Sequence, residues 1–179
     1  HDTTNHYHYR LVACGFEDIQ SNERFVLNIN HLRSKRGTGK ESNAKRMTNV
    51  DSLLVMLHNI QENQIFHDTD ILLVGDYNCY TQEQPIQTLI QNGYEDLVMQ
   101  YDSTGYSYVY HSEVGYLDRV FASPTMAKQV KMVRPYHLNT DYFYSRGFKR
   151  GLDKTIFRYA DHDPILISIQ LVPNHIHHD

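Results

Sequence analysis

The stretch Ile71-Leu-Leu-Val-Gly-Asp-Tyr-Asn78 gives the clearest indication of the fold. Its first four residues form an apolar run, which is typical of a strand that is buried on both faces of a sheet. Gly75 ends the run, and the polar residues Asp76 and Asn78 come directly after it. The stretch therefore predicts a central strand that presents polar side chains at one edge of a sheet.

Two strands and a long helix are predicted on the N-terminal side of this stretch. Short apolar runs predict strands over Arg10–Phe16 and Arg24–Asn30, and the second leads directly to His31. Residues Ser42–Gln64 predict a helix, because apolar side chains recur there at spacings of three and four. We expect this apolar stripe to pack in the core, and it consists of Met47, Val50, Leu54 and Leu57.

Helices and strands also follow on the C-terminal side. Pro85 suits the first turn of a helix predicted over Glu83–Asn92, and Ser123 is a suitable N-cap for a second, short helix. Residues 136–160 predict a long surface loop. Further strands are predicted over Tyr106–Tyr110, Tyr116–Ala122 and Ile165–Val172. This order of elements predicts the α/β (α+β) class, with helices and sheets in layers.

Length and composition limit the classes of protein that need to be considered. The 179 residues fit one domain over 1–179, since domains commonly run from about 50 to 250 residues. No stretch reaches the roughly 20 apolar residues that cross a bilayer, so no membrane span is predicted. The formal charge of −4 is unlike the basic surface of proteins that coat nucleic acids. A local phosphate site remains open, because a divalent cation and a few basic side chains can supply its positive charge.

The two cysteines, Cys14 and Cys79, lack the clustered spacing of a zinc site. They are either one disulfide or two separate buried thiols, and the strand-like surroundings of Cys14 favour the thiols. The first residues show no charged segment followed by an apolar run, so no signal peptide is predicted there.

Polar clusters lie at the ends of three apolar segments. They are His31, Asp76 with Asn78, and Asp161-His-Asp163. Strand ends on a rigid sheet commonly carry catalytic groups, so we expect the clusters to converge. Each cluster alone has a structural alternative: an Asx turn at Asp76, a satisfied structural histidine at His31 and a loop cap at Asp161.

Four motifs combine these clusters with their neighbours. They are Asn30-His-Leu-Arg-Ser-Lys35, Gly75-Asp-Tyr-Asn78, Tyr116-Leu-Asp-Arg-Val-Phe-Ala-Ser123 and Ala160-Asp-His-Asp-Pro164. In this order they resemble the later motifs of the endonuclease/exonuclease/phosphatase superfamily, and the connecting segments resemble its bacterial extracellular nucleases. The resemblance covers Arg10–Leu171 and implies the α/β/β/α sandwich of the deoxyribonuclease-like type. It also implies a metal-dependent nuclease for DNA or RNA that is extracellular or in the cell envelope.

The resemblance implies roles for the motif residues. Asp76 would orient or deprotonate the attacking water, and Asn78 would hold a phosphate oxygen and position Asp76. His162 would contact the scissile phosphate, with Asp118 accepting its other ring proton. His31 would be a second histidine that faces the phosphate.

A metal and a substrate surface are implied in the same way. Asp161 would bind a divalent metal, foremost Mg²⁺ with Mn²⁺ or Ca²⁺ as alternatives, because these cations prefer oxygen ligands. Arg33 and Lys35 are candidates for substrate binding, although a solvated charged loop is the ordinary fate of such a stretch. The alternating tyrosines of residues 106–110 either stack on bases or form one packed face, which the alternation favours, so we assign them no site.

Members of the superfamily carry a further half-sandwich before these motifs, so the chain resembles only the C-terminal part of the domain. One face of the sheet would then be exposed, and a longer chain, a partner chain or a homodimer would cover it. We expect the longer chain, and little activity from this chain alone. The alternatives are a lipid or inositol-phosphate phosphoesterase with the same motifs, and a non-catalytic binding module.

Overall fold

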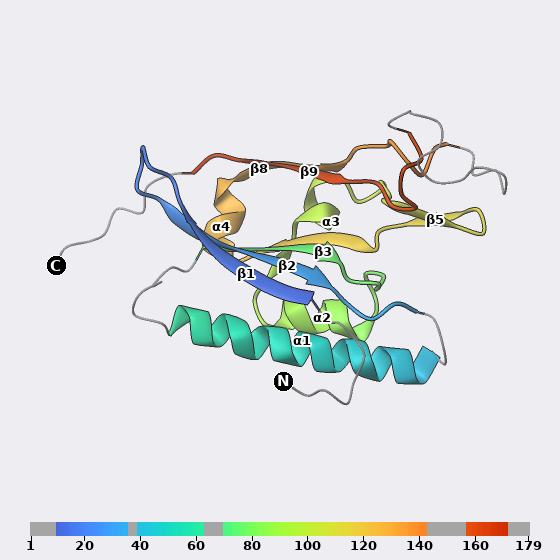
Figure 1. The fold of residues 1–179 in the computed structure, drawn as a ribbon, viewed down its shortest axis with the longest axis horizontal. Helices are drawn as coiled ribbons and strands as arrows, with labels where there is room; N and C mark the ends of the chain where they lie inside the picture. Colours follow the sequence, from blue (N-terminus) through green and yellow to red (C-terminus); the bar gives the residue numbers. More distant parts are fainter. Residues whose placement is uncertain (1–9, 36–38, 63–69, 143–156, 172–179) are drawn as a thin grey trace.

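The central feature of the computed structural model, which describes residues 10–35, 39–62, 70–142 and 157–171, is a sheet of five strands (Figure 1). Its order is β1-β2-β3-β7-β4. β2 and β3 are parallel, and the other neighbours are antiparallel. The strands are β1 (Arg10–Glu17), β2 (Arg24–His31), β3 (Ile71–Asp76), β4 (Glu95–Asp96) and β7 (Asp118–Ala122). The predicted central strand, β3, therefore lies in the middle of the sheet.

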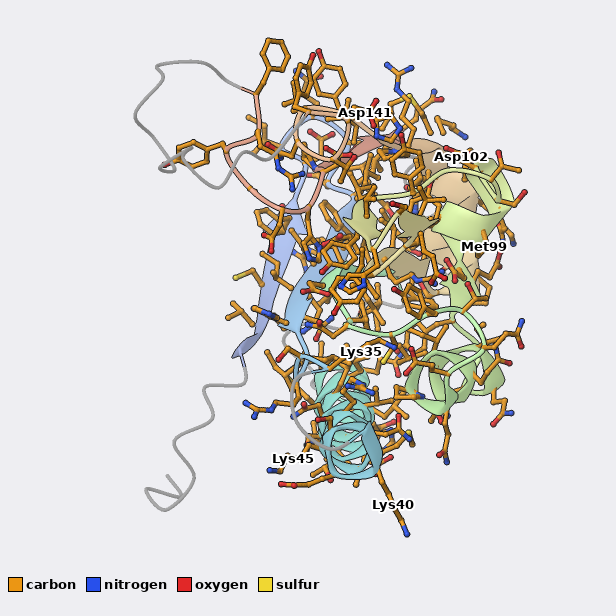
Figure 2. All side chains as sticks on the ribbon, turned by 90° about the vertical axis from the view of Figure 1, so that its right-hand side faces the viewer. Lys35, Lys40, Lys45, Met99, Asp102 and Asp141 are labelled. Atoms are coloured by element: carbon orange, nitrogen blue, oxygen red, sulfur yellow. The ribbon has the colours of Figure 1, made fainter. Side chains whose placement is uncertain are left out.

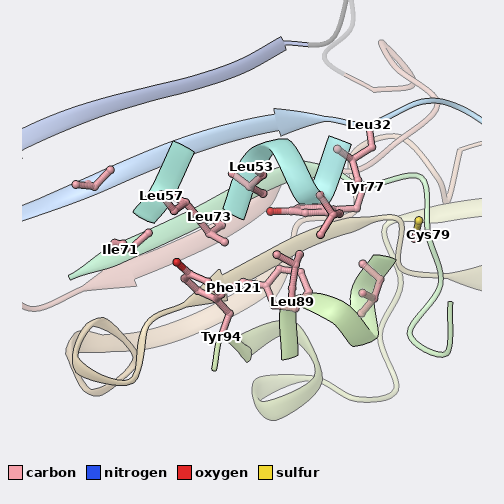
Figure 3. Close-up of a cluster of buried hydrophobic side chains, with 13 residues drawn as sticks. Leu32, Leu53, Leu57, Ile71, Leu73, Tyr77, Cys79, Leu89, Tyr94 and Phe121 are labelled. Atoms are coloured by element: carbon pink, nitrogen blue, oxygen red, sulfur yellow. The ribbon is translucent and has the colours of Figure 1, made fainter. Parts of the chain in front are cut away.

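Two helices cover one face of this sheet, α1 (Gly39–Gln61) and α2 (Gln84–Gln91) (Figure 1). Leu53 and Leu57 of α1 pack against Leu73 of β3 and Phe121 of β7 (Figure 3). The predicted stripe on α1 is only partly correct. Val50 and Leu57 are buried, whereas Met47 and Leu54 lie at the margin, and the buried side also includes Arg46, Asn49 and Leu53. The helix therefore presents a neighbouring stripe, with polar members, to the sheet.

The other face of the sheet carries a second apolar core. Leu72, Val120 and Ala122 of the sheet contact Val130 and Val133 there. The covering elements are α3 (Leu97–Tyr101), α4 (Pro124–Gln129), β8 (Val130–Pro135) and β9 (Ile165–Ile169), of which β8 and β9 form a separate antiparallel sheet (Figure 1). Layers of helices and two sheets agree with the predicted sandwich class.

An apolar part of this second face is left uncovered in the described structure. Val12, Phe16 and Ile29 are 49%, 45% and 50% exposed. They share one face of the sheet because Val12 is paired with Ile29 and Phe16 with Phe25 across β1 and β2. We call Val12, Phe16 and Ile29 the β1–β2 stripe. The sequence-based prediction of a sheet face that needs a further covering segment stays a prediction.

Both cysteines are free thiols, but only one is buried. Cys79 is in the core, whereas Cys14 is exposed beside the β1–β2 stripe. The prediction of a buried Cys14 is wrong in this structure, because none of the described elements covers the face of β1 on which it lies.

A short hairpin of β5 (Tyr108–Tyr110) and β6 (Glu113–Gly115) extends beyond the central sheet (Figure 1). Residues 136–142 form neither helix nor strand, as predicted, and 143–156 of the predicted loop lie outside the described residues. Within the described parts of the chain, no helix is both long and apolar enough to cross a membrane.

Candidate active site

The predicted catalytic residues of three neighbouring strands meet at one edge of the central sheet. His31 at the end of β2 is paired with Asp76 at the end of β3, and Asp76 is paired with Asp118 at the start of β7. β7 runs antiparallel to β3, so its first residue reaches the edge at which β2 and β3 end. Register alone therefore places these three side chains next to one another.

Gly75 is required for this arrangement. Its φ is 135°, a conformation that residues with a side chain rarely adopt, and a Cβ there would lie 1.9 Å from the backbone oxygen of Asn30. The glycine lets β3 approach β2 closely just before Asp76. The signal in the sequence is the Gly-Asp-Tyr-Asn motif itself.

Asn78 holds the carboxylate of Asp76 at both oxygens. Its backbone N–H donates to Oδ1 over 2.8 Å, and its side-chain amide donates to Oδ2 over 2.9 Å. The same amide donates to the backbone oxygen of Leu32 over 3.1 Å, which ties the turn to the end of β2. The Asx turn that the sequence offers as a structural alternative is therefore the same arrangement that positions the Asp76 carboxylate.

His162 and Asp118 form a hydrogen-bonded pair. Nδ1 of His162 lies 2.7 Å from Oδ2 of Asp118, and the hydroxyl of Ser107 donates to the same oxygen over 2.7 Å. The backbone of His162 also bridges to Tyr108. The pair fixes the imidazole with Nδ1 toward the carboxylate, so Nε2 is left to face a ligand.

Asp163 organises the loop that carries His162. It is buried, and it accepts hydrogen bonds from the backbone N–H of Leu138 and Asn139 over 3.1 and 2.7 Å. The amide of Asn139 in turn donates to the backbone oxygen of His162 over 2.7 Å. The sequence gives no signal for Ser107 or Asn139, because serine and asparagine are common in loops. Asp163 does lie within one of the four motifs, but the implied mechanism gives it no role.

The pKa values of Asp76 and His162 are both raised in the site. Burial raises the pKa of Asp76, and the neighbouring negative charge of Asp118 raises it further. Burial lowers the pKa of His162, but the hydrogen bond to Asp118 and the negative charges around the ring outweigh this effect, so its pKa is raised overall. Raised pKa values of this kind, caused by burial and by neighbouring charges, are typical of functional sites.

Asp76, Asp118 and His162 also form a group with the spacing of metal ligands. One ligand atom from each lies within 4.8 Å of the others. The two carboxylates fit a hard cation such as Mg²⁺ or Mn²⁺. Asp161, which the resemblance makes a ligand of the metal, is exposed and lies outside this group.

The remaining predicted residues lie at the margin of the site. Nε2 of His31 is 3.6 Å from Oδ2 of Asp76, and the side chain is 64% exposed. Lys35 forms an ion pair with Glu83 and lies over the ring of Tyr80, with 4.4 Å to the ring centroid. Figure 2 shows Lys35 beside the body of the protein, whereas Lys40 points away from it. Arg33 is partly buried, and its backbone oxygen accepts a hydrogen bond from Arg46.

The fold is similar to that of solved endonuclease/exonuclease/phosphatase family proteins. A family member from Bacteroides thetaiotaomicron superimposes with a TM-score of 0.62 at 17% sequence identity, over 87% of this chain and 54% of that one. A mannosyl-6-phosphatase from the same species gives a TM-score of 0.62 at 15% identity, over 89% and 57% of the two chains.

A third similar structure is NExo from Neisseria meningitidis, with a TM-score of 0.53 at 17% identity, over 82% of this chain and 61% of that one. NExo is described as a 3′–5′ exonuclease and, in another structure, as a 3′ phosphatase bound to a product DNA hairpin. No family model and no curated protein matches the sequence. The likeness confirms the predicted fold, and the chain spans little more than half the length of the first two relatives.

Proposed function

We propose that this protein is a metal-dependent phosphoesterase, and specifically a nuclease that hydrolyses phosphodiester bonds when its domain is complete. The observation that carries the proposal is the convergence of Asp76, Asp118 and His162 within 4.8 Å at one sheet edge. These groups come from β3, β7 and the loop before β9. Phosphoryl transfer needs a base for water and a donor for the phosphate oxygens, and this group contains both.

In the proposed mechanism Asp76 accepts a proton from the attacking water, and its raised pKa suits that role. Asn78 keeps the Asp76 carboxylate in one orientation through its two hydrogen bonds. His162 donates from Nε2 to a phosphate oxygen while Asp118 stabilises the imidazolium. To His31, whose Nε2 is 3.6 Å from Oδ2 of Asp76, we assign the binding of a second phosphate oxygen.

A divalent cation would be held by the carboxylate oxygens of Asp76, and we keep Asp161 as a second ligand on the resemblance of its motif alone, because it lies outside the group of three. It would supply Lewis-acid stabilisation of the negative charge that develops on the phosphate. His162 and Asp118 are less suitable as its ligands, because their nearest atoms are already joined by a hydrogen bond. Mg²⁺ is the cation that we propose, with Mn²⁺ as an effective substitute.

The length of the matched relatives and the β1–β2 stripe support a larger domain. The chain corresponds to 54% and 57% of the first two relatives, and the stripe lies on the sheet face that β8 and β9 cover elsewhere. We propose that a further segment of a longer chain covers the stripe and completes the second sheet. This chain alone is then expected to have little activity.

The experiment that tests the function compares a phosphodiester with a phosphomonoester. The full-length protein is assayed with single-stranded and duplex DNA, and separately with mannose 6-phosphate, because one structural relative is a mannosyl-6-phosphatase. We expect Mg²⁺-dependent cleavage of DNA and little release of phosphate from the sugar. Release of phosphate from the sugar without DNA cleavage would replace the nuclease by a phosphatase.

A further inference from the structure

A row of aromatic rings begins at His162 and runs outward along the β5–β6 hairpin. The ring of Tyr108 is 4.6 Å from that of His162, measured between centroids. Tyr110 follows at 6.3 Å from Tyr108 with the rings nearly parallel, and His111 stacks on Tyr110 at 4.1 Å. We call Tyr108, Tyr110 and His111 the aromatic row.

The row is fixed to the candidate active site by the backbone. Tyr108 forms a bridge with His162, and the preceding residue, Ser107, donates its hydroxyl to Asp118. The backbone N–H of Asp163 donates to the oxygen of Ser107 over 2.8 Å. The inner end of the row therefore keeps a constant position relative to the proposed phosphate site.

The outer end of the row is open to solvent. Tyr110 is 56% exposed, and His111 is exposed beside it. Neither of the two buried apolar clusters includes Tyr108 or Tyr110, so the row is not one face of the core. The tyrosines at 108 and 110 share one face, as the alternation favours, but this face packs on His162 and not in the core.

We propose that the aromatic row stacks on the unpaired bases of a nucleic-acid strand whose scissile phosphate lies at His162. Every base has a π-face, so stacking binds a strand without selecting its sequence. The chain carries a formal charge of −4, and stacking supplies affinity that does not depend on a basic surface. Paired bases inside a duplex do not expose these faces, so the row favours single-stranded DNA or RNA, frayed ends and the unpaired stretches that open in supercoiled DNA.

This inference rests on the proposed function, because it places the substrate strand at the same site. Its test removes a ring from the protein and the bases from the substrate. Tyr110→Leu is compared with the wild type in the full-length protein, on oligothymidylate and on an oligomer of the same length built from abasic tetrahydrofuran units. The two oligomers share a phosphate backbone and differ in their bases.

We expect Tyr110→Leu to reduce kcat/KM on oligothymidylate by about 5- to 100-fold and to leave cleavage of the abasic oligomer unchanged. Tyr110→Phe keeps the ring and is expected to retain activity. Val114→Ala is the matched control, because Val114 is 60% exposed and alternates with the row on the opposite face of the same hairpin. An equal effect of Tyr110→Leu on both oligomers, or none on either, would overturn the proposal.

A binding measurement in EDTA separates this inference from the nuclease itself. Fluorescence anisotropy with labelled oligomers is expected to show that the wild type prefers oligothymidylate to the abasic strand, and that Tyr110→Leu loses the preference. Such a preference in a protein that cleaves neither strand would support the aromatic row and refute the nuclease. The absence of a preference in a protein that cleaves DNA would refute the row alone.

Discussion

At the scale of single residues, the carboxylate of Asp118 is the point on which the orientation of His162 depends. It accepts hydrogen bonds from the imidazole and from Ser107 at the same oxygen. The negative charge also helps to keep the pKa of His162 above its ordinary value, against the effect of burial. His162, the proposed donor to the phosphate, therefore needs Asp118 if it is to stay protonated toward neutral pH.

Asp118→Asn is expected to lower kcat/KM for DNA by about 10²- to 10⁴-fold, the range of a lost acid–base interaction. The sign of its pH effect follows from the raised pKa of His162. The His162 imidazolium is present below that pKa and is lost as the pH rises through it. Asp118→Asn removes the negative charge that raises the pKa of His162, so the pKa falls and the alkaline limb of the profile moves to lower pH. The measurement is kcat/KM against pH, with Asp51→Asn on the exposed side of α1 as a control. An unchanged alkaline limb would contradict the assigned role.

Sequence patterns predicted that the candidate residues would converge, because several of them lie at strand ends. His31, Asp76 and Asp118 are brought together by register, which follows from the order of the strands. Ser107, the partner of Asp118, and Asn139, the partner of the His162 backbone, were not predicted, because their contacts join distant parts of the chain and depend on tertiary packing. The metal role of Asp161 stays a prediction.

At the scale of the elements, the helix α1 fixes the sheet that carries the site. Leu53 of α1 is completely buried in the cluster that contains Leu73 and Phe121 (Figure 3). Leu53→Ala is expected to reduce the free energy of unfolding by about 2 to 5 kcal/mol, through lost burial and a cavity. Val55→Ala removes an apolar side chain that is 61% exposed on the same helix, and it is expected to change stability by less than about 0.5 kcal/mol.

Urea unfolding of both variants in the full-length protein measures the difference. Similar midpoints for Leu53→Ala and Val55→Ala would contradict the packing of α1 against the sheet.

The elements were predicted where apolar spacing is regular. The strands β2 and β3 and the helix α2 agree within a few residues, and Ser123 accepts the backbone N–H of Met126 over 3.4 Å as the predicted cap of α4. The strand β8 was not predicted, because Lys131 and Arg134 interrupt its apolar residues and Pro135 ends it. Its partner β9 lies far along the chain, and only that pairing makes the segment a strand.

At the scale of the whole molecule, the β1–β2 stripe distinguishes two possibilities. Either the second sheet consists of β8 and β9 alone and the stripe stays exposed, or a larger domain covers it. If a further segment covers the stripe, as we propose, Val12 is buried in the full-length protein. Val12→Thr, which adds a hydroxyl at nearly constant volume, is then expected to destabilise that protein by about 1 to 3 kcal/mol. In this chain alone, where Val12 is 49% exposed, the same change should have little effect.

Val114→Thr is the control for this prediction, because Val114 is exposed on β6, away from the stripe. Thermal unfolding of the two forms of the protein provides the comparison. Equal, small effects of Val12→Thr in both forms would show that nothing covers the stripe.

The central claim, that the edge of the sheet is a metal-dependent nuclease site, is tested most directly by nicking of supercoiled plasmid DNA. The full-length protein is incubated with Mg²⁺, with Mn²⁺ and with EDTA, beside Asp76→Ala and the surface control Asp51→Ala. We predict nicking with either metal and none with EDTA, a loss of about 100-fold or more in Asp76→Ala, and wild-type activity in the control. Absence of nicking by the intact protein, or wild-type nicking by Asp76→Ala, would contradict the account.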